Sequence, residues 1–336
     1  TMKGPIMPTD FDPGTEAARW HFHPGEAVEN NPLFDWPPRP KAVLLWYRAY
    51  WLMISTTTVS LLVALLAVWL WVPDLAETRT LSAGWIVTIW LSYLVPHSIV
   101  AGGLHLWLYR AKGQGTTRKY DKRGQISDNG TFTFRSQVRD NMFWSLTSGV
   151  AQLTAFQIIT MWLMANDYAP TITFTENPVW FVLALMLLPI WSAFHFYWVH
   201  RLLHVPFLYK HVHSLHHRNV NIGPWSGLSM HPVEHFPYLT TLMIHWIVAS
   251  HPIHLIFHII YQGPGAAMTH TGYEDLLIRD KRRLALGTFY HQLHHRYYEC
   301  NYGNQEMPWD RWFGTFHDGT EDGKARLRDR LKARKT

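Results

Sequence analysis

PVWFVLALMLLPIWSAFHFYWVHRLLH, residues 178–204, joins a long apolar run to two histidine residues that are four positions apart. The run Pro178–Val199 is long enough to cross a hydrocarbon core of about 30 Å as a helix. On a helix, His200 and His204 would lie on one face, one turn apart. The stretch therefore predicts a transmembrane helix that ends in a pair of imidazoles.

Three other apolar segments are long enough to cross the same core. They are Tyr50–Val72, Ser82–Tyr109 and Phe143–Ala165, and the first and third contain no Lys, Arg, Asp or Glu. Of the 336 residues, 48% are hydrophobic, including 18 Trp, 17 Phe and 15 Tyr, which is unusual for a soluble enzyme. We therefore predict an all-α integral membrane protein with four transmembrane helices in two hairpins, in preference to buried helices in a large soluble core.

Basic residues are concentrated between the second and third of these helices. The loop 110–142 contains eight Lys and Arg, whereas Pro73–Leu81 contains only Arg79 and Asn166–Asn177 contains none. Because Lys and Arg accumulate on the cytoplasmic side, we expect this loop and both termini in the cytosol. The net charge of +6 and the basic C-terminus suit contact with anionic headgroups, and the membrane spans make nucleic acid the weaker interpretation of this charge.

The chain is expected to divide into four regions. These are a cytosolic arm (1–49), the transmembrane helices (50–199), a histidine-rich catalytic cap (200–318) and a basic tail (319–336). Within the cap, residues 236–261 are apolar but interrupted by Pro237 and Pro252 and rich in histidine, which favours a bent or re-entrant segment over a fifth span. We expect no cleavable signal peptide, and the lack of a C-terminal dilysine signal favours a bacterial inner membrane over the endoplasmic reticulum.

The spacing of the histidines is the main functional signal. Eighteen of the 22 lie between His195 and His317, and the HxxxH pair is followed by two HxxHH triplets, 213–217 and 291–295. Each triplet can direct two or three imidazoles toward one point on a helix. Eight imidazoles exceed the four ligands of a tetrahedral zinc ion, whereas two ions sharing eight to ten would each keep an open position for oxygen. The single cysteine, Cys300, excludes a thiolate site and an internal disulfide.

These motifs and several shorter ones resemble a known family. In chain order they are His200-Arg-Leu-Leu-His204, His213-Ser-Leu-His216-His217, His231-Pro-Val-Glu234, His270-Thr-Gly-Tyr273, His291-Gln-Leu-His294-His295, Asn301-Tyr-Gly303 and Trp309-Asp-Arg-Trp-Phe-Gly-Thr315. Over residues 178–318 their order and spacing are similar to the fatty acid hydroxylase/sterol desaturase superfamily, and the HTGY segment is nearest to sterol 4-methyl oxidases. The resemblance implies a non-haem di-iron site, molecular oxygen as co-substrate, and electrons from a separate ferredoxin, rubredoxin or cytochrome b5 with its reductase. Zinc is expected to replace iron in some purified preparations.

The resemblance also implies a set of metal ligands. By position in the motifs these are His200, His204, His213, His216, His217, His270, His291, His294 and His295. The candidates for a tenth are His231, His245 and Glu274, although His231 precedes a proline and can instead fix a turn. The family commonly has an aspartate seven residues before its first ligand, where this chain has Ala193, which indicates a different hydrogen-bond partner for a ligand.

The expected reaction is hydroxylation or desaturation of an unactivated C–H bond in a fatty acyl chain, a sterol or other triterpenoid, or a carotenoid. Phe194, Tyr197 and Trp198 are candidates to line the route of such a substrate, or else anchor the helix at the membrane interface. The segments 301–303 and 309–315 are expected to pack beneath the site. Two alternatives remain open: an oxygenase that acts on a small polar substrate, and a non-catalytic histidine-rich metal-binding membrane protein.

Overall fold

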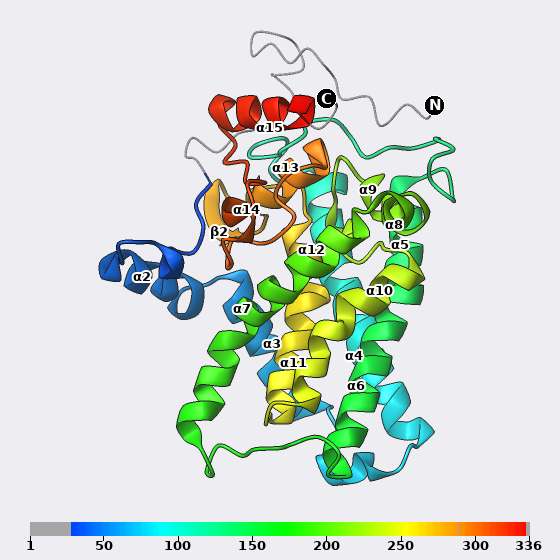
Figure 1. The fold of residues 1–336 in the computed structure, drawn as a ribbon. Coiled ribbons are helices and arrows are strands. Elements are labelled where there is room, and N and C mark those ends of the chain that lie inside the picture. Colours follow the sequence, from blue (N-terminus) through cyan, green and yellow to red (C-terminus); the bar gives the residue numbers. More distant parts are fainter. Residues whose placement is uncertain (1–27, 288, 334–336) are drawn as a thin grey trace.

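The computed structural model describes residues 28–287 and 289–333, and these are mostly helical (Figure 1). The helices are α2 (Pro40–Tyr47), α3 (Thr56–Leu70), α4 (Ala83–His105), α5 (Gln137–Trp144), α6 (Val150–Ala165), α7 (Pro178–Leu203), α8 (Pro206–Leu208), α9 (Ser214–His217), α10 (Pro232–Leu239), α11 (Pro252–Gln262), α12 (Pro264–Thr269), α13 (Phe289–Tyr297), α14 (Trp309–Trp312) and α15 (Glu321–Ala333). Among the described residues, a single antiparallel pair, β1 (Asp275–Ile278) and β2 (Lys281–Ala285), forms the sheet. The predicted all-α fold is confirmed apart from this hairpin.

Short π- and 3-10-helical turns extend or connect several helices. The π turns are η2 (Arg48–Leu52), η4 (Leu106–Arg110), η5 (Ser145–Gly149) and η6 (Tyr209–His213), and the 3-10 turns are η1 (Pro32–Phe34), η3 (Leu75–Arg79), η7 (Pro224–Ser226) and η8 (Thr240–Trp246). With these turns included, four helical stretches have the length and apolar composition of membrane spans: Pro40–Leu70, Ala83–Arg110, Gln137–Ala165 and Pro178–Leu203. The predicted number of spans is confirmed.

The first stretch is not one continuous helix. It is interrupted after Leu52, and α3 begins at Thr56 because Ser55 is extended and its side chain accepts a hydrogen bond from the Thr58 backbone. At 1.5 Å per residue, the 15 residues of α3 extend about 22 Å. Figure 1 shows α2 projecting sideways from the bundle. Tyr50, where the sequence predicted the first span to begin, lies within the candidate span Pro40–Leu70 but before this break.

The basic loop and the histidine-rich region lie at the same end of the bundle. The backbone N–H of Tyr120, in this loop, donates to the Gly272 carbonyl at 2.9 Å, and the Gln114 side chain binds Asp275 and Leu277 of β1. The connections 71–82 and 166–177 lie at the opposite end (Figure 1). This arrangement agrees with the topology predicted from charge, while the cytosolic orientation of the cap remains a prediction.

Residues 232–262 form a helical hairpin buried within the bundle. α10 and η8 run in one direction, and α11 returns along α3 and α7. Between them, Ser250 exchanges backbone hydrogen bonds with Pro170 and Ile172 in the far connection, so the hairpin extends through the bundle. Nearly every residue of α11 is buried, which is the environment in which a chain break at membrane depth is tolerated. The re-entrant position of this segment in a membrane remains a prediction.

The two terminal regions differ from the expectations for them. Residues 1–27 and 334–336 lie outside the described residues, and the rest of the arm includes α2. The tail forms α15, which lies across the end of the cap that is farthest from the spans (Figure 1). There Arg330 binds the carbonyl oxygens of Glu299 and Gly314. This placement does not support the expected contact between the tail and membrane headgroups.

Candidate metal centre

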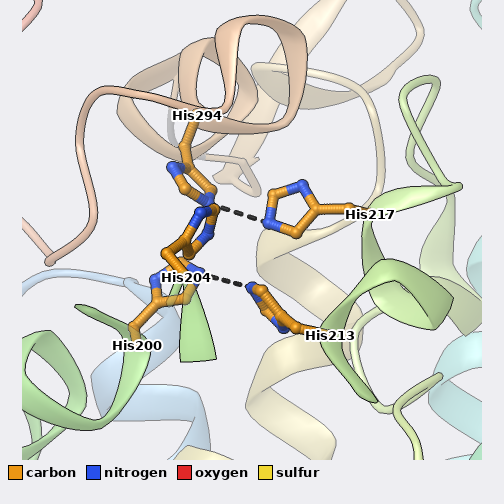
Figure 2. A group of neighbouring side chains, drawn as sticks. All are labelled: His200, His204, His213, His217 and His294. Carbon is orange, nitrogen blue, oxygen red and sulfur yellow. Dashed lines mark hydrogen bonds between the residues drawn. The ribbon is translucent and has the colours of Figure 1, made fainter. Parts of the chain in front are cut away.

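Nine buried or half-buried histidine side chains converge in two groups. The first contains His200, His204, His213, His217 and His294, and the second contains His216, His270, His291 and His295. Within each group the potential ligand nitrogens lie within 4.8 Å of one another. Figure 2 shows the first group, with His294 approaching from α13 toward His217. The nine residues are the same nine that the motifs indicated, and their role as ligands remains a prediction.

Both HxxHH triplets contribute to both groups. His213 and His217 point into the first group while His216 points into the second, and His291 and His295 point into the second while His294 points into the first. A helix turns about 100° per residue, so positions i and i+4 differ by about 40° whereas i+3 and i+4 differ by about 100°. The i and i+4 imidazoles of a triplet therefore point into the same histidine group, and the i+3 imidazole points into the other group.

The segments that hold these residues begin and end at recognisable signals. The Asn177 side chain accepts from the Trp180 backbone and Pro178 is the first residue of α7, which places His200 in its last turn and His204 at its C-cap. His270 is the C-cap of α12, and the second triplet lies on α13. Helix ends thus bring distant parts of the chain to one point.

The distances between imidazoles fit shared metal ions. Nε2–Nε2 separations are 3.0 Å for His200–His213 and for His217–His294, 2.9 Å for His270–His291, and 3.0 Å for His291–His295. Two nitrogens about 2.1 Å from one ion and about 90° apart would lie about 3.0 Å from each other. The spacing is therefore that of neighbouring ligands on one ion.

The hydrogen bonds of the Nδ1 atoms, on the other side of these rings, also fit metal binding through Nε2. Nδ1 of His200 donates to the Tyr302 carbonyl at 2.6 Å, Nδ1 of His294 to the Cys300 carbonyl at 2.6 Å, and Nδ1 of His270 to the Ala266 carbonyl at 2.9 Å. A neutral imidazole that donates through Nδ1 keeps a lone pair on Nε2. These lone pairs face other imidazole nitrogens, an arrangement that a cation between them would stabilise.

Asp310 holds the loop that supplies two of these carbonyls. Its carboxylate accepts from the Tyr302 backbone at 2.9 Å, the Gly303 backbone at 2.7 Å and the Tyr290 hydroxyl at 2.6 Å. Asn301 has a positive φ of 52°, and its side chain donates to the carbonyls of Tyr290 and His317. The segments 301–303 and 309–315 therefore orient ligands rather than contact the cavity.

A carboxylate orients one histidine, although not from the position of Ala193. Nδ1 of His213 lies 2.7 Å from Oε1 of Glu234 on α10, and both side chains are buried. Ala193 is buried on α7. Glu234 is part of the motif that begins at His231, but the sequence alone predicted no role for it. A charged residue in an otherwise apolar and histidine-containing stretch was the available signal.

The histidines are neutral at physiological pH. Burial lowers the pKa of His216 to about 4 and lowers the pKa of His270 and of His294 to about 3. The pKa values of His213 and His295 are also lowered well below the ordinary value, first by burial and then by neighbouring imidazoles. Neutral imidazole is the form that binds iron, zinc, copper or nickel.

A cavity of about 420 Å³ lies against both groups. Its wall includes five of the nine histidines: His200, His213, His216, His270 and His291. Phe196, Val199, His200 and Leu203 form a continuous face of α7 along it, with helical spacing. A molecule in this cavity would therefore contact residues of both groups at once.

The three candidates for a tenth ligand do not lie in either group among the described residues. His231 caps α10, where its Nδ1 accepts from the Val233 backbone, so it fixes a turn. His245 binds Ser250 and His258. Glu274 lines the cavity, but its Oε2 accepts from the Tyr120 hydroxyl. Each has a hydrogen-bond partner that accounts for its position, and a role as tenth ligand stays a prediction.

The aromatic residues expected along the substrate route face away from the cavity. Ring centroids of Phe194, Tyr197 and Trp198 lie 5.5, 6.0 and 5.5 Å from the ring of Trp309. They occupy the opposite side of α7 and pack against α14. The cavity lies on the other face of α7, that of Phe196, Val199 and His200, and a role of the three aromatic residues in substrate entry stays a prediction.

The comparisons with known proteins concern the same part of the chain. The family model described as fatty acid hydroxylase matches residues 184–315. The chain is 31% identical over 141 residues to a Delta(7)-sterol 5(6)-desaturase of Gibberella zeae, covering 40% of this chain and 42% of that protein. It is 29% identical over 175 residues to a putative Delta(7)-sterol-C5(6)-desaturase of Arabidopsis thaliana, covering 48% and 59%. No solved structure gives a significant match.

These matches extend over about half the length of the curated relatives. A third relative, a Delta(7)-sterol-C5(6)-desaturase of Nicotiana tabacum, is 30% identical over 142 residues, covering 40% of this chain and 49% of that protein. All three relatives are named as sterol 5(6)-desaturases, whereas the HTGY segment had favoured sterol 4-methyl oxidases. The matched region contains all nine converging histidines and the loop held by Asp310. For residues 184–315, the family model and these relatives support the fatty acid hydroxylase/sterol desaturase superfamily.

Proposed function

We propose that this chain is an oxygen-dependent di-iron oxidoreductase that hydroxylates or desaturates an unactivated C–H bond of a lipid-like substrate. The observation that carries the proposal is the pair of histidine groups, one of five and one of four, beside a single cavity. Nine imidazoles exceed what one ion binds, and nitrogen ligands of this number suit iron that keeps an open coordination position. His200, His204, His213, His217 and His294 would hold one ion, and His216, His270, His291 and His295 the other.

Iron bound there would supply the activation of molecular oxygen and the oxidising power for C–H cleavage. The chain itself contributes the fixed orientation of the ligands. The carbonyls of Tyr302, Cys300 and Ala266 and the carboxylate of Glu234 each accept from the Nδ1 of one histidine. His200, His294 and His213 would therefore present Nε2 to one ion and His270 to the other. Phe196, Val199 and Leu203 would place the apolar body of a substrate next to these imidazoles and exclude water.

The substrate classes that suit this proposal are a fatty acyl chain, a sterol or other triterpenoid, and a carotenoid. The names of the curated relatives favour a sterol, and desaturation is the reaction in those names. Electrons would come from a separate ferredoxin, rubredoxin or cytochrome b5 with its reductase. We further propose that the cap and both termini face the cytosol, since the basic loop lies at the cap end. A bacterial inner membrane as the location remains a prediction.

Oxygen-dependent turnover of a lipid tests the proposal. The full chain, loaded with iron and reconstituted in lipid nanodiscs, would receive each candidate electron carrier, NAD(P)H and ¹⁸O₂ together with a sterol or fatty acyl substrate. We expect a new product by mass spectrometry, either carrying ¹⁸O or lacking two hydrogens, and no product from a His291→Ala variant. An iron-loaded protein that accepts electrons and yields no product from any of the three substrate classes would contradict the proposal.

A further inference from the structure

The cavity is also lined by a second polar cluster, whose residues belong to neither histidine group. Tyr50 on η2 donates to Oε1 of Glu306 at 3.0 Å, and Tyr261 on α11 donates to the same oxygen at 3.4 Å. The two hydroxyl groups lie 2.9 Å apart. All three side chains line the cavity that also reaches five of the histidines. This phenol–carboxyl cluster connects η2, the buried hairpin and the loop before α14.

The cluster retains capacity for another hydrogen bond. Both phenols use Oε1 of Glu306, and its Oε2 has no side-chain partner among residues 28–287 and 289–333. Burial raises the pKa of Glu306, which favours a protonated carboxyl group that both donates and accepts. The neighbouring phenols also both donate and accept. A ligand group complementary to this cluster should have the same two capacities.

A hydroxyl group meets that requirement better than the other head groups a lipid offers. It can donate to one oxygen of the cluster and accept from another. A carboxylate would place a second acid beside Glu306, and a hydrocarbon end would leave the cluster unpartnered. The head group of a free fatty acid is therefore the wrong chemistry for this cluster.

We propose that Tyr50, Tyr261 and Glu306 bind the hydroxyl group of an otherwise apolar alcohol and so determine which carbon lies beside the histidine groups. The inference rests on the proposed function and makes its substrate class more specific. The three residues are specificity-determining residues. With the hydroxyl held by this cluster in a cavity of fixed length, the position oxidised is set by its distance from the hydroxyl.

Binding measurements that need neither oxygen nor a reductant test this. A tritium-labelled 3-hydroxysterol is bound to the purified holoprotein in detergent and displaced by the unlabelled alcohol, its 3-methyl ether or its 3-deoxy counterpart. We expect the alcohol to bind about tenfold more tightly than the deoxy compound, as for the loss of one or two buried hydrogen bonds. The ether, which accepts but does not donate, should lie between them.

Matched variants locate the effect. Tyr261→Phe and Glu306→Met should each reduce the preference for the alcohol to about threefold or less. Tyr238→Phe is the control, because Tyr238 also lines the cavity but donates its hydroxyl to the carbonyl and side chain of Gln262. The preference of the Tyr238→Phe variant for the alcohol over the deoxy compound should stay at the wild-type value. If Glu306→Met does not fold, the Tyr50→Phe/Tyr261→Phe double variant tests the same cluster.

Equal binding of alcohol and deoxy compound to the wild type would overturn the inference, and so would a preference that survives in both cluster variants. These outcomes are separable from the fate of the proposed function. A preference for the hydroxyl compound without oxidation would support the hydroxyl-binding cluster and contradict the proposed oxidoreductase function. Oxidation of lipids without this preference would support the oxidoreductase function and contradict the cluster.

Discussion

Two sets of buried histidines, one in the hairpin and one in the cap, differ in their partners. In the hairpin, His245 binds Ser250 at 2.9 Å and His258 at 3.1 Å, and Nε2 of His258 lies 2.9 Å from the Ser192 hydroxyl. Every ring nitrogen of this pair has a protein partner. In the cap, Nε2 atoms face other Nε2 atoms, and the Nδ1 atoms that bind anything bind oxygen. Burial is common to both sets, and His97 is also buried with unpartnered ring nitrogens, so it is the convergence of several imidazole nitrogens on one point that distinguishes the candidate ligands.

The largest expected difference between the two regions is in catalysis. His291→Ala removes an imidazole that lies within 3.0 Å of both His270 and His295. We expect oxygen-dependent product formation to fall by more than about a hundredfold, beyond the 10–100-fold cost typical of losing an outer hydrogen-bond partner. His258→Ala, the matched change in the hairpin, should keep most of the activity per folded molecule. Equal losses of activity in the two variants would contradict the distinction between candidate ligands in the cap and structural histidines in the hairpin.

A smaller effect is expected at the carboxylate that contacts His213. Glu234→Gln keeps the shape of the side chain but weakens acceptance from Nδ1, so metal affinity should fall about 10–100-fold in a chelator competition. Glu274→Gln is the control, since Glu274 binds Tyr120 and lies outside both groups. Loss of affinity in the Glu274 variant would show that this residue ligates metal after all.

Much of this arrangement could be predicted from the sequence. All four apolar runs overlap the candidate spans, but the first span begins earlier, at Pro40, and contains a break before α3 that the apolar run did not reveal. The HxxxH and HxxHH motifs identified all nine histidines that converge. Such local patterns depend on helix periodicity, which the sequence states directly.

The parts that could not be predicted depend on contacts between distant segments. Helix periodicity separates the i+3 histidine of a triplet from the i and i+4 histidines, but no spacing within one segment reveals which histidines of the two triplets share a group. Glu234 meets His213 only once α10 packs beside η6. The face of α7 toward the cavity is likewise fixed by its neighbours, so the sequence did not reveal that Phe194, Tyr197 and Trp198 lie on the other face.

In the hairpin, substitution should affect stability rather than metal. His258→Ala leaves Nε2 of His245 and the Ser192 hydroxyl without a partner in a buried setting, and the free energy of unfolding should fall by about 1–3 kcal/mol. Thermal unfolding in detergent would measure this as a lower Tm, with the metal content of the folded fraction unchanged. A Tm equal to that of the wild type would show that the hairpin network contributes nothing to stability.

The smallest effect concerns the loop next to the first group. Cys300 is buried, which raises the pKa of its thiol, and its carbonyl accepts from His294. Because Asp310 holds this loop, we expect a maleimide to leave Cys300 unlabelled both before and after chelation of the metal, by intact-mass spectrometry. Labelling that appears only after chelation would show that the metal, and not Asp310, keeps the loop in place.

The central claim is that the two histidine groups hold two iron ions, and metal content tests it most directly. Protein expressed in iron-replete medium would be compared with the His216→Ala/His294→Ala double variant, which removes one imidazole from each group. The account predicts two irons per wild-type chain and loss of both in the variant. One tightly held zinc ion, or a folded wild-type protein without metal, would contradict it.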